Sequence, residues 1–302
     1  MNFTDFQTAL LDEIKVISGE ELEVFPKKLN KNNGVIKDAM CIRKKGEAMA
    51  PLIYLEDYYS QYKNGVPLIT LARHMIELYQ EDIPKKAPTS LKSFNDFETV
   101  RNKIFCRLVN YEMNSTLLAR IPYRRTLDLA ITYYYHVDDL VCKDATIVIT
   151  NEHLIKWKIG EDTLYHIAWE NTIRELPCDV ERIEDTLRDL MTPEELEEIS
   201  PSDHSDSDFI PMHIITNSSR CMGAISILYP LSLKKTADHL NSNLYILPSS
   251  IHECILIPQH KSYSKQDLEQ IVTDINTTQV APQEVLSNRV YFYNRGEDTI
   301  SL

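Results

Sequence analysis

The stretch LPSSIHECILIP, residues 247–258, places two serines, a histidine, a glutamate and a cysteine between two apolar runs. A serine or cysteine nucleophile needs a base within hydrogen-bond reach and a third group that orients the base. On an extended strand, Ser250, His252 and Cys254 would share one face at intervals of about 7 Å, which is too far for direct contact. Proline and paired serines between two strand-forming runs are instead typical of a hairpin turn. We therefore predict a turn here and assign no catalytic residue.

Two further patterns contain the residue types of a metal site. His136 and Asp138, in YYYHVDD, could share one strand face and supply two ligands, but the sequence offers no third ligand nearby. The run SDHSDSD, residues 202–208, lacks the central glycine and the closing glutamate of a calcium loop. The chain also has no G-x-G or G-K-S/T pattern of a phosphate-binding loop. We predict neither a metal nor another cofactor.

Residues 27–45 carry seven cationic side chains against one acid, Asp38. Such a cluster could follow a phosphate backbone, although the formal net charge of −13 would make most of the surface repel nucleic acid. The alternative is an edge hairpin that its lysines keep from aggregating. The candidate binding residues are Lys27, Lys28, Lys31, Arg43, Lys44 and Lys45 of this hairpin, together with Ser250 and His252 of the turn.

The composition is that of a globular protein. A chain of 302 residues with 43 % apolar residues can bury one large core or two smaller ones. No apolar run approaches the roughly 18 to 20 residues of a membrane helix, and the first residues lack a signal-peptide pattern. The six cysteines are widely spaced and form no C-x-x-C pair, which does not indicate a disulfide framework. We expect a cytoplasmic protein without a membrane partner.

The first 88 residues predict a small α+β subdomain that carries the basic hairpin. Helical and strand periodicities predict a helix, two strands joined by the turn NKNNG, a third strand and two more helices. Their ranges are 3–16, 21–29, 34–43, 51–55 and 55–62, with a last helix from Pro67. Thr4 and Gln7 fit a capping box of the first helix. The loop PKKAPTS, residues 84–90, is the candidate boundary to a main domain over 89–302.

The middle of the chain contains a regular alternation and an acidic segment. Residues 126–136 alternate apolar and polar side chains, which predicts a half-buried strand with Asp128 on it. The run ATIVIT, residues 145–150, predicts a more deeply buried strand, and Asn151 fits the cap of the helix that follows. The segment 178–210 holds twelve acidic and two basic side chains. It predicts an amphipathic helix with Val180, Ile183, Leu187 and Leu190 inward, a helix start at Thr192, and a polar loop over 200–209.

The last third predicts strands that alternate with helices. Their ranges are strand 212–217, strand 223–229, helix 231–241, strands 243–248 and 252–258, helix 265–276 and strand 289–294. Ser264 and Asp267 fit a capping box of the helix at 265. Hairpins between helices predict an α+β fold, with antiparallel sheets of hairpins that alternate with amphipathic helices covering one face.

Several segments, in this order, resemble a known family over nearly the full chain. They are NNGVIKDAM, APLIYLEDYYSQYKNG, RTLDLAI, ATIVITNEHLIKW, LYHIAWENT, ILYP, LYILPSSIHECILIP and VYFYNR. The family that they resemble is an uncharacterised domain-of-unknown-function family from anaerobic gut bacteria. The resemblance implies one structural unit rather than a fusion, and it implies no activity, cofactor or catalytic residue.

Three functions follow from these patterns. The leading expectation is a cytoplasmic protein that binds a macromolecule, most simply a protein partner, without catalysis. The first alternative is an enzyme of an unfamiliar class with a site gathered from separate strands around His136 and His252. The second is nucleic-acid binding through the hairpin at 27–45. A deep pocket that gathers His136, Asp138, Arg124 or His252 would favour the enzyme, whereas a flat surface would favour the binding protein.

Overall fold

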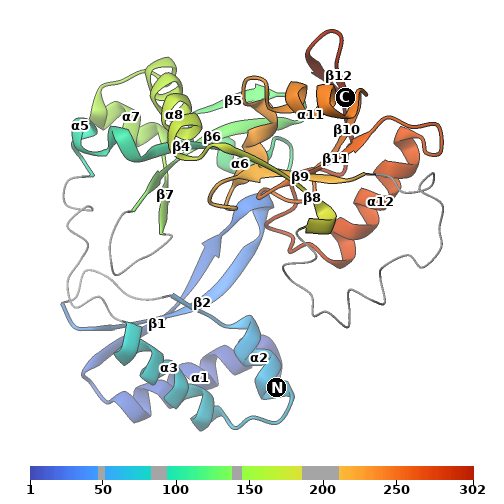
Figure 1. Ribbon diagram of the computed structural model, residues 1–302. Coiled ribbons are helices and arrows are strands. Elements are labelled where there is room, and N and C mark those ends of the chain that lie inside the picture. The colour runs from blue at the N-terminus through green and yellow to red at the C-terminus, as the bar shows by residue number, and fades with distance from the viewer. Residues whose placement is uncertain (47–51, 83–93, 138–144, 186–210) are drawn as a thin grey trace. The chain divides into compact units, whose positions relative to one another are not determined.

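The computed structural model describes residues 1–46, 52–82, 94–137, 145–185 and 211–302 (Figure 1). The chain divides into unit 1, residues 1–93 with 137–145, and unit 2, residues 94–136 with 146–302. All strand pairs in the described residues are antiparallel, and helices accompany each sheet. The predicted α+β fold with antiparallel sheets is confirmed.

Unit 1 contains the predicted hairpin, third strand and three helices. Its sheet has the order β1 (Leu22–Asn30), β2 (Ile36–Lys44), β3 (Leu52–Tyr54), and its helices are α1 (Phe3–Ser18), α2 (Glu56–Lys63) and α3 (Leu68–Asp82). One cap differs from the prediction, because the side chain of Asn2 rather than Thr4 accepts a hydrogen bond from the Asp5 N–H at 2.9 Å. Asn2 has an extended backbone just before the first turn, as an N-cap residue requires.

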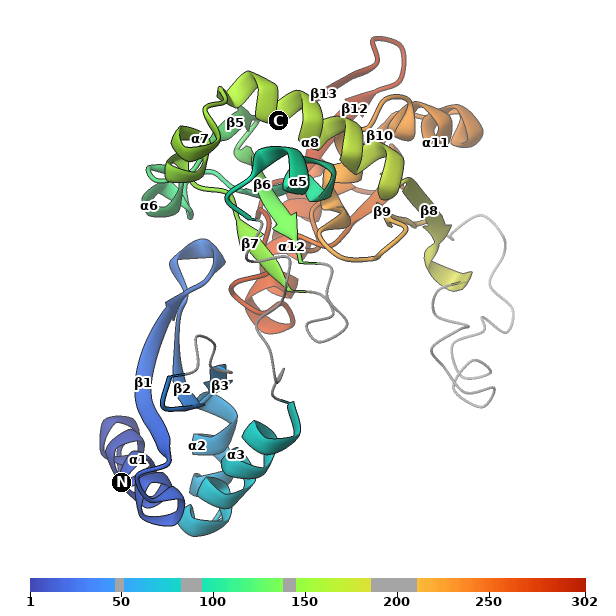
Figure 2. The same cartoon turned by 90° about the vertical axis from the view of Figure 1, so that its left-hand side faces the viewer.

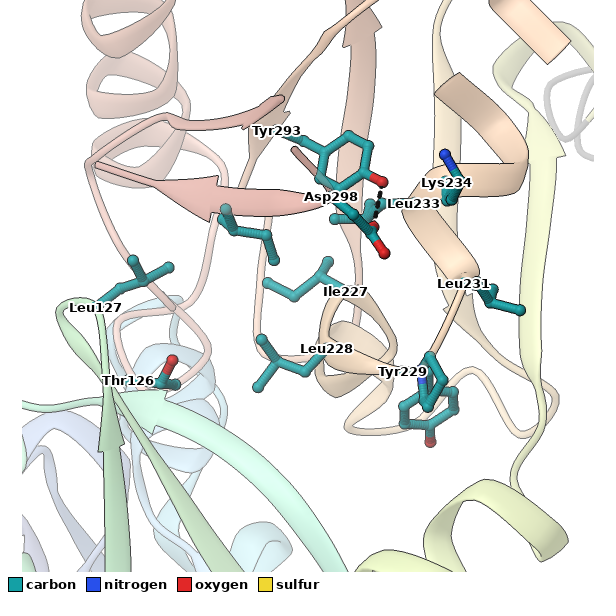
Figure 3. A pocket seen from close by; sticks show the side chains of 12 residues that line it. Thr126, Leu127, Ile227, Leu228, Tyr229, Leu231, Leu233, Lys234, Tyr293 and Asp298 are labelled. Carbon is teal, nitrogen blue, oxygen red and sulfur yellow. Dashed lines mark hydrogen bonds between the residues drawn. The ribbon is translucent and has the colours of Figure 1, made fainter. Parts of the chain in front are cut away.

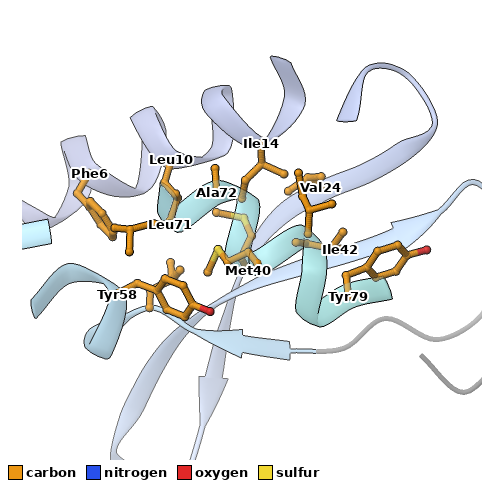
Figure 4. Packing of buried hydrophobic residues seen from close by; sticks show 13 residues of the cluster. Phe6, Leu10, Ile14, Val24, Met40, Ile42, Tyr58, Leu71, Ala72 and Tyr79 are labelled. Atoms are coloured by element: carbon orange, nitrogen blue, oxygen red, sulfur yellow. The ribbon is translucent and has the colours of Figure 1, made fainter. Parts of the chain in front are cut away.

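The core of unit 1 lies between one face of this sheet and the helices α1 and α3 (Figure 4). Apolar side chains at helical spacing on α1 meet alternate residues of β1 and β2, since strand side chains point to opposite faces in turn. The central buried residues are Phe6, Leu10, Ile14, Val24, Met40, Ile42, Leu71, Ala72 and Met75. Burial of this face fixes which strand residues point outward.

Unit 2 contains two further sheets. The first consists of β4 (Ile104–Asn110), β5 (Tyr123–Thr126), β6 (Leu129–His136) and β7 (Thr146–Val148), with β6 paired to the other three. The second has the order β13 (Thr299–Ser301), β12 (Tyr291–Asn294), β10 (Leu244–Leu247), β11 (Cys254–Pro258), β9 (His213–Asn217), β8 (Cys178–Arg182). The helices are α5 (Phe97–Val100), α6 (Ser115–Leu118), α7 (Asn151–Trp157), α8 (Glu161–Glu175), α11 (Ser232–Leu240) and α12 (Lys265–Thr278), and α8 lies across the first sheet (Figure 2).

The prediction of one half-buried strand over 126–136 is wrong. Leu127 has a φ of +53° and lies in a tight turn between β5 and β6, and Asp128 follows it in that turn. β6 is buried along nearly its whole length, including Thr132, because it is the central strand of its sheet. β7, predicted as the more deeply buried strand, is short and partly exposed at residues 146–148.

Three other expectations over unit 2 need correction. Cys178–Arg182 is a strand paired with β9 rather than the start of a helix, and Gly223–Leu228 is a short 3-10 helix (η3) rather than a strand. The cap of α7 is Thr150, in a capping box with His153, and Asn151 is the first helical residue. The predicted elements and loop between 186 and 210, and the boundary loop 84–90, lie outside the described residues.

The remaining predicted elements of the last third are present. The predicted capping box of α12 is confirmed, since Ser264 Oγ accepts from the Asp267 N–H at 3.2 Å and Asp267 accepts from the Ser264 N–H at 2.8 Å. The hairpin of β10 and β11 is confirmed, with Leu247 opposite Ile255. The short strand β13, residues 299–301, is an addition to the predicted set.

The core of unit 1 gives a first prediction. Leu10→Ala is expected to lower the free energy of unfolding by about 2–5 kcal/mol, because Leu10 is fully buried and its truncation leaves a cavity. Val16→Ala on the same helix is the control and should change it by less than about 0.5 kcal/mol, because Val16 is 79 % exposed. Urea unfolding followed by circular dichroism measures both. Equal losses in the two variants would contradict this packing.

Candidate functional site

The sheet of unit 1 has an outer face that points away from its helices. In the strand register, Phe25 lies opposite Cys41 and Cys41 opposite Leu52; in the next row, Lys27 lies opposite Ala39 and Ala39 opposite Tyr54. Directly opposite residues share a face of a sheet. We call the following residues the outer face: Glu23, Phe25, Lys27, Leu29, Lys37, Ala39, Cys41, Arg43, Leu52 and Tyr54, together with Lys31, which follows β1 and whose Nζ lies over the Tyr54 ring. None of them belongs to the buried cluster of unit 1.

Large apolar side chains are exposed on the outer face. Phe25 and Leu52 are each 37 % exposed, and Tyr54 is 39 % exposed. The residues between them on β2 are the small Ala39 and Cys41, which are buried. The outer face is therefore a sheet surface on which an aromatic ring from each flanking strand remains in contact with solvent.

Cations accompany both exposed rings. The Lys31 Nζ lies 4.9 Å from the centre of the Tyr54 ring, and the Arg43 guanidinium lies 5.6 Å from the centre of the Phe25 ring. The Arg43 Nε also donates to Glu23 Oε2 at 2.8 Å. Lys27 is exposed and forms no ion pair with any residue that the structure describes. The outer face thus combines cationic groups with ring surfaces.

The charges of Lys27 and Arg43 act on the thiol beneath them. Burial raises the pKa of the Cys41 thiol, and the positive charges of Lys27 and Arg43 oppose that shift. Cys41 therefore stays a neutral thiol at neutral pH. It serves as a small filler between the flanking strands rather than as a nucleophile.

The structure divides the predicted basic residues between two faces. Lys27, Lys31 and Arg43 belong to the outer face, whereas Lys28, opposite Asp38, and Lys44, opposite Leu22, have the register of the core face. Lys45 follows the end of β2, residue 44. Lys37, one of the seven cations of residues 27–45, was not among the predicted binding residues; its Nζ lies 3.6 Å from Glu56 Oε1. The rings of Phe25 and Tyr54 were not among them either. The alternation of side chains along β1 would have predicted that Phe25 and Lys27 share one face of the sheet. The place of Tyr54 on that face depends on how β3 pairs with β2, which the sequence alone does not give.

The turn within LPSSIHECILIP, residues 247–258, is hydrogen-bonded to the neighbouring loop at residues 217–223. Ser250 Oγ accepts a hydrogen bond from the His252 N–H at 3.0 Å, and the His252 carbonyl accepts from Thr216 Oγ1 at 2.8 Å. The His252 Nδ1 lies 3.2 Å from the Met222 nitrogen, whose N–H it accepts. Ser250 and His252 therefore lie in the loop rather than in alternation along a strand, and their observed contacts are structural. Burial raises the pKa of the Cys254 thiol, so Cys254 is no nucleophile.

The loop that His252 supports, residues 217–223, has an unusual backbone. Arg220 and Met222 have φ values of +52° and +53°, a region that side-chain-bearing residues rarely adopt. A Cβ atom on Gly223 would lie 2.6 Å from the Asn217 nitrogen and 2.7 Å from the His252 carbonyl oxygen. The loop therefore requires glycine at 223. It presents Cys221, which is exposed.

Arg107 is a cation without a carboxylate partner in the described part of the chain. Its Nε donates to Thr132 Oγ1 at a long 3.4 Å, and no ion pair to it is formed there. Burial lowers the pKa of its guanidinium, and Tyr134 and Cys221 oppose that shift. The guanidinium thus lies within electrostatic range of the exposed thiol on the strained loop.

The residues of the predicted enzyme alternative occupy separate settings. Arg124 Nε donates to Glu161 Oε1 at 2.9 Å, its terminal nitrogen contacts Asp162, and its guanidinium lies 3.9 Å from the centre of the Tyr165 ring. His136 ends β6, where it pairs with Thr146 of β7. Asp138 lies outside the described residues. Arg124, His136 and His252 are absent from the linings of the pockets identified among the described residues.

A small pocket of 310 Å³ lies between the β5–β6 turn, the start of α11 and strand β12 (Figure 3). Leu127, Leu231 and Asp298, which line it, all have positive φ values. Inside the pocket the Tyr293 hydroxyl donates to Asp298 Oδ1 at 2.5 Å. Burial and this hydrogen bond raise the pKa of Tyr293. The Tyr293 hydroxyl is thus satisfied from within the pocket, and Thr126 and Lys234 add further polar groups to its lining.

The loop at 217–223 gives a second prediction. Gly223→Ala is expected to lower the free energy of unfolding of unit 2 by about 1–3 kcal/mol, because the added Cβ meets backbone atoms that cannot move away cheaply. Gly296→Ala in an exposed turn is the control and should cost less than about 0.5 kcal/mol. Urea unfolding followed by the fluorescence of Trp157 and Trp169, both in unit 2, measures the two variants. A tolerated alanine at 223 would show that the loop can relax.

Comparison with known proteins places the chain in a family. A model of the family of unknown function DUF5688 matches residues 3–295. No curated protein and no solved structure matches the chain. None of the helices that the structure describes is both long and apolar enough to cross a membrane. Because the family model covers both units and nearly the full length, the chain belongs to the DUF5688 family of unknown function.

Proposed function

We propose that this protein binds single-stranded nucleic acid through the outer face of unit 1. The observation that supports the proposal is the pairing of exposed rings with cations on one sheet surface, at Phe25 with Arg43 and Tyr54 with Lys31. Bases stack on aromatic side chains without regard to sequence, and lysine and arginine neutralise the phosphates. A sheet with solvent-exposed rings is one of the common ways to present such stacking surfaces.

The charge balance supports an anionic partner. The outer face carries Lys27, Lys31, Lys37 and Arg43, and the described ion pairs on it use the two acids Glu23 and Glu56. This local excess of cations stands in a chain with a formal charge of −13. Acidic surface elsewhere repels a long duplex, whereas a flexible single strand can approach one face alone.

The rings argue for a nucleic acid over an acidic protein segment. An acidic peptide would neutralise the lysines, but it would leave the exposed faces of Phe25 and Tyr54 without a matching group. A base covers such a ring and gains about 1–3 kcal/mol by stacking. The protein partner expected from the sequence remains the alternative occupant. We also propose that the protein acts in the cytoplasm of an anaerobic gut bacterium, which rests on the sequence patterns and the resemblance alone.

Lys27 and Lys28 provide a matched test of the proposal. They are adjacent, have the same charge and are both exposed, but the register places them on opposite faces of the sheet. Lys27→Gln is expected to weaken binding of a fluorescein-labelled oligothymidylate of about 12 nucleotides and to reduce the slope of log K against log salt by about 0.7. Lys28→Gln should leave the slope unchanged. Fluorescence anisotropy over a range of salt concentrations measures both.

Tyr54 tests the stacking part of the proposal. Tyr54→Ala should weaken binding by about 1–3 kcal/mol, and Tyr54→Phe should retain it, because the ring rather than the hydroxyl stacks on a base. The proposal is wrong if the wild-type protein does not bind the oligonucleotide, or if Lys27→Gln and Lys28→Gln weaken binding equally. Binding of a polyglutamate peptide in place of the oligonucleotide would identify a protein partner instead.

A second candidate function is chemistry by the Cys221 thiol. The observation that favours it is Arg107, a guanidinium without a carboxylate partner in the described residues that lies within electrostatic range of Cys221. A neighbouring cation favours the thiolate, which is the reactive form of cysteine. The loop that carries Cys221 has two residues with positive φ, and such conformations are concentrated at functional sites.

Alkylation tests this second candidate. Iodoacetamide is expected to react faster with Cys221 than with Cys178, because burial raises the pKa of Cys178 to about 11 while Cys221 is exposed. Arg107→Met should slow the reaction at Cys221 several-fold and should be tolerated, since Arg107 is only half-buried and forms no ion pair with a described residue. Mass spectrometry of the peptides gives the rates. An unchanged rate at Cys221 in Arg107→Met would remove Arg107 from the chemistry.

A further inference from the structure

We infer that unit 2 contains a site for a small organic anion, in a cleft between the edge of the six-stranded sheet and α11. The cleft has a volume of 720 Å³, which is enough for a ligand of metabolite size. Its lining residues come from β8, β9 and α11, with Asp185 after β8 and Pro230 before α11, all within unit 2. This site is independent of the outer face in both location and ligand.

The strand register explains which side chains form the floor of the cleft. Arg182 lies opposite His213 and Val180 opposite Ile215, so alternate residues of β8 share one face with alternate residues of β9. Cys178, Val180, Arg182 and His213 of this face line the cleft. β8 is the edge strand of this sheet, so no further strand of the described residues borders the floor on that side. The wall opposite the floor belongs to α11.

His213 is the observation that points to a ligand. Its side chain is 8 % exposed and lines the cleft, and its Nδ1 is buried without a hydrogen bond to any residue that the structure describes. Native proteins satisfy nearly all buried polar atoms, because leaving one unpaired costs about 1–3 kcal/mol. Burial is the main cause that lowers the pKa of His213, so the ring is neutral at neutral pH and one of its nitrogens carries a proton.

The charged residues that line the cleft are the acids Glu181 and Asp185 and the cations Arg182 and Lys235. Two of its charged lining residues are paired: Arg182 Nε lies 3.2 Å from Glu184 Oε2, and Glu181 Oε2 lies 2.5 Å from a terminal nitrogen of Arg220. Lys235 lines the cleft from α11 and forms no ion pair with a described residue. His239 lies one helical turn further along the same helix and also lines the cleft. The donors of Lys235 and the two histidines therefore face the same space.

The remaining lining favours an organic ligand over a bare ion. Val180 and Pro230 are apolar, and burial raises the pKa of the Cys178 thiol to about 11, so that it too presents a neutral surface. No group of three or more histidine, cysteine or acidic side chains in the described residues has the arrangement of a metal site. The geometry fits a ligand with a carboxylate or phosphate at one end, near Lys235 and His213, and an apolar part against Val180 and Pro230.

Three small probes of similar size test this site. Benzoate and phenyl phosphate carry the two anionic groups on the same ring, and benzyl alcohol is their neutral counterpart. We expect calorimetric titration to detect at least one of the two anions and not the alcohol, and the stronger anion distinguishes a carboxylate from a phosphate ligand. Lys235→Met should weaken that binding by about tenfold, the usual effect of losing a charged hydrogen bond.

Lys234→Met is the matched control for this experiment. Lys234 precedes Lys235 on α11, but it pairs with Asp238 at 3.7 Å and lines the other pocket, so its variant should bind the anion as the wild type does. His213→Leu should also abolish binding, and His213→Asn, which keeps a polar group near the position of Nδ1, should retain part of it. The inference is wrong if the alcohol binds as well as the anions, if no anion binds, or if Lys234→Met and Lys235→Met have equal effects.

Discussion

The burial of one face of the β1–β2–β3 sheet is the constraint on which the outer face depends. Val24, Met40 and Ile42 pack against α1 and α3, and a shift of the register by one residue would move every strand side chain to the opposite face. The same packing that hides these three therefore forces Phe25 and Lys27 outward. Stability and surface chemistry are fixed by one register, so neither can change without the other.

Unit 2 uses buried polar contacts to join segments that are distant in sequence. Asp128, in the β5–β6 turn, accepts hydrogen bonds from Ser287 at 2.6 Å and Tyr291 at 2.8 Å, which ties the four-stranded sheet to the six-stranded one. The Asn110 amide donates to the Leu286 carbonyl at 3.1 Å at the same junction. Such contacts cost little when every partner is satisfied. The Nδ1 of His213 is one of three buried side-chain atoms in the described part of unit 2 without such a partner, with Glu184 Oε1 and Ser226 Oγ, and of these three residues only His213 lines the proposed anion site.

Local signals predicted the elements whose ends are fixed by nearby residues. The capping box of Ser264 and Asp267 and the asparagine-rich turn at 31–34 act within a few residues, so they can be read from the sequence alone. The errors arose where distant partners decide. β6 is buried by neighbours on both sides, so its polar Thr132 gave a false alternation, and Cys178–Arg182 forms a strand because β9 is available to pair with it.

The candidate sites were only partly predictable for the same reason. The cationic cluster at 27–45 is visible in the sequence. Which of its cations lie on the outer face, as Lys27 does, and which on the other, as Lys28 does, depends on which face of the sheet packs against the core. The cleft at His213 could not be predicted, because β8, β9 and α11 come together only in the folded sheet. Sequence alone located charges, whereas the pairing of strands decided which charges act together.

The cations of the outer face oppose self-association through its exposed rings. An exposed sheet with apolar side chains is a hazard, and charged side chains are a common protection against pairing with a second copy. Protection alone, however, places no demand on which face the lysines occupy, since a charge on either face of the hairpin repels another copy. The contacts of Arg43 with Phe25 and of Lys31 with Tyr54 place cations directly over the rings. A ligand that stacks on those rings must displace the side chains of Arg43 and Lys31. If the ligand carries phosphates, the displaced side chains can bind to them. The arrangement therefore penalises a neutral aromatic ligand and favours one in which rings and negative charge alternate along a chain.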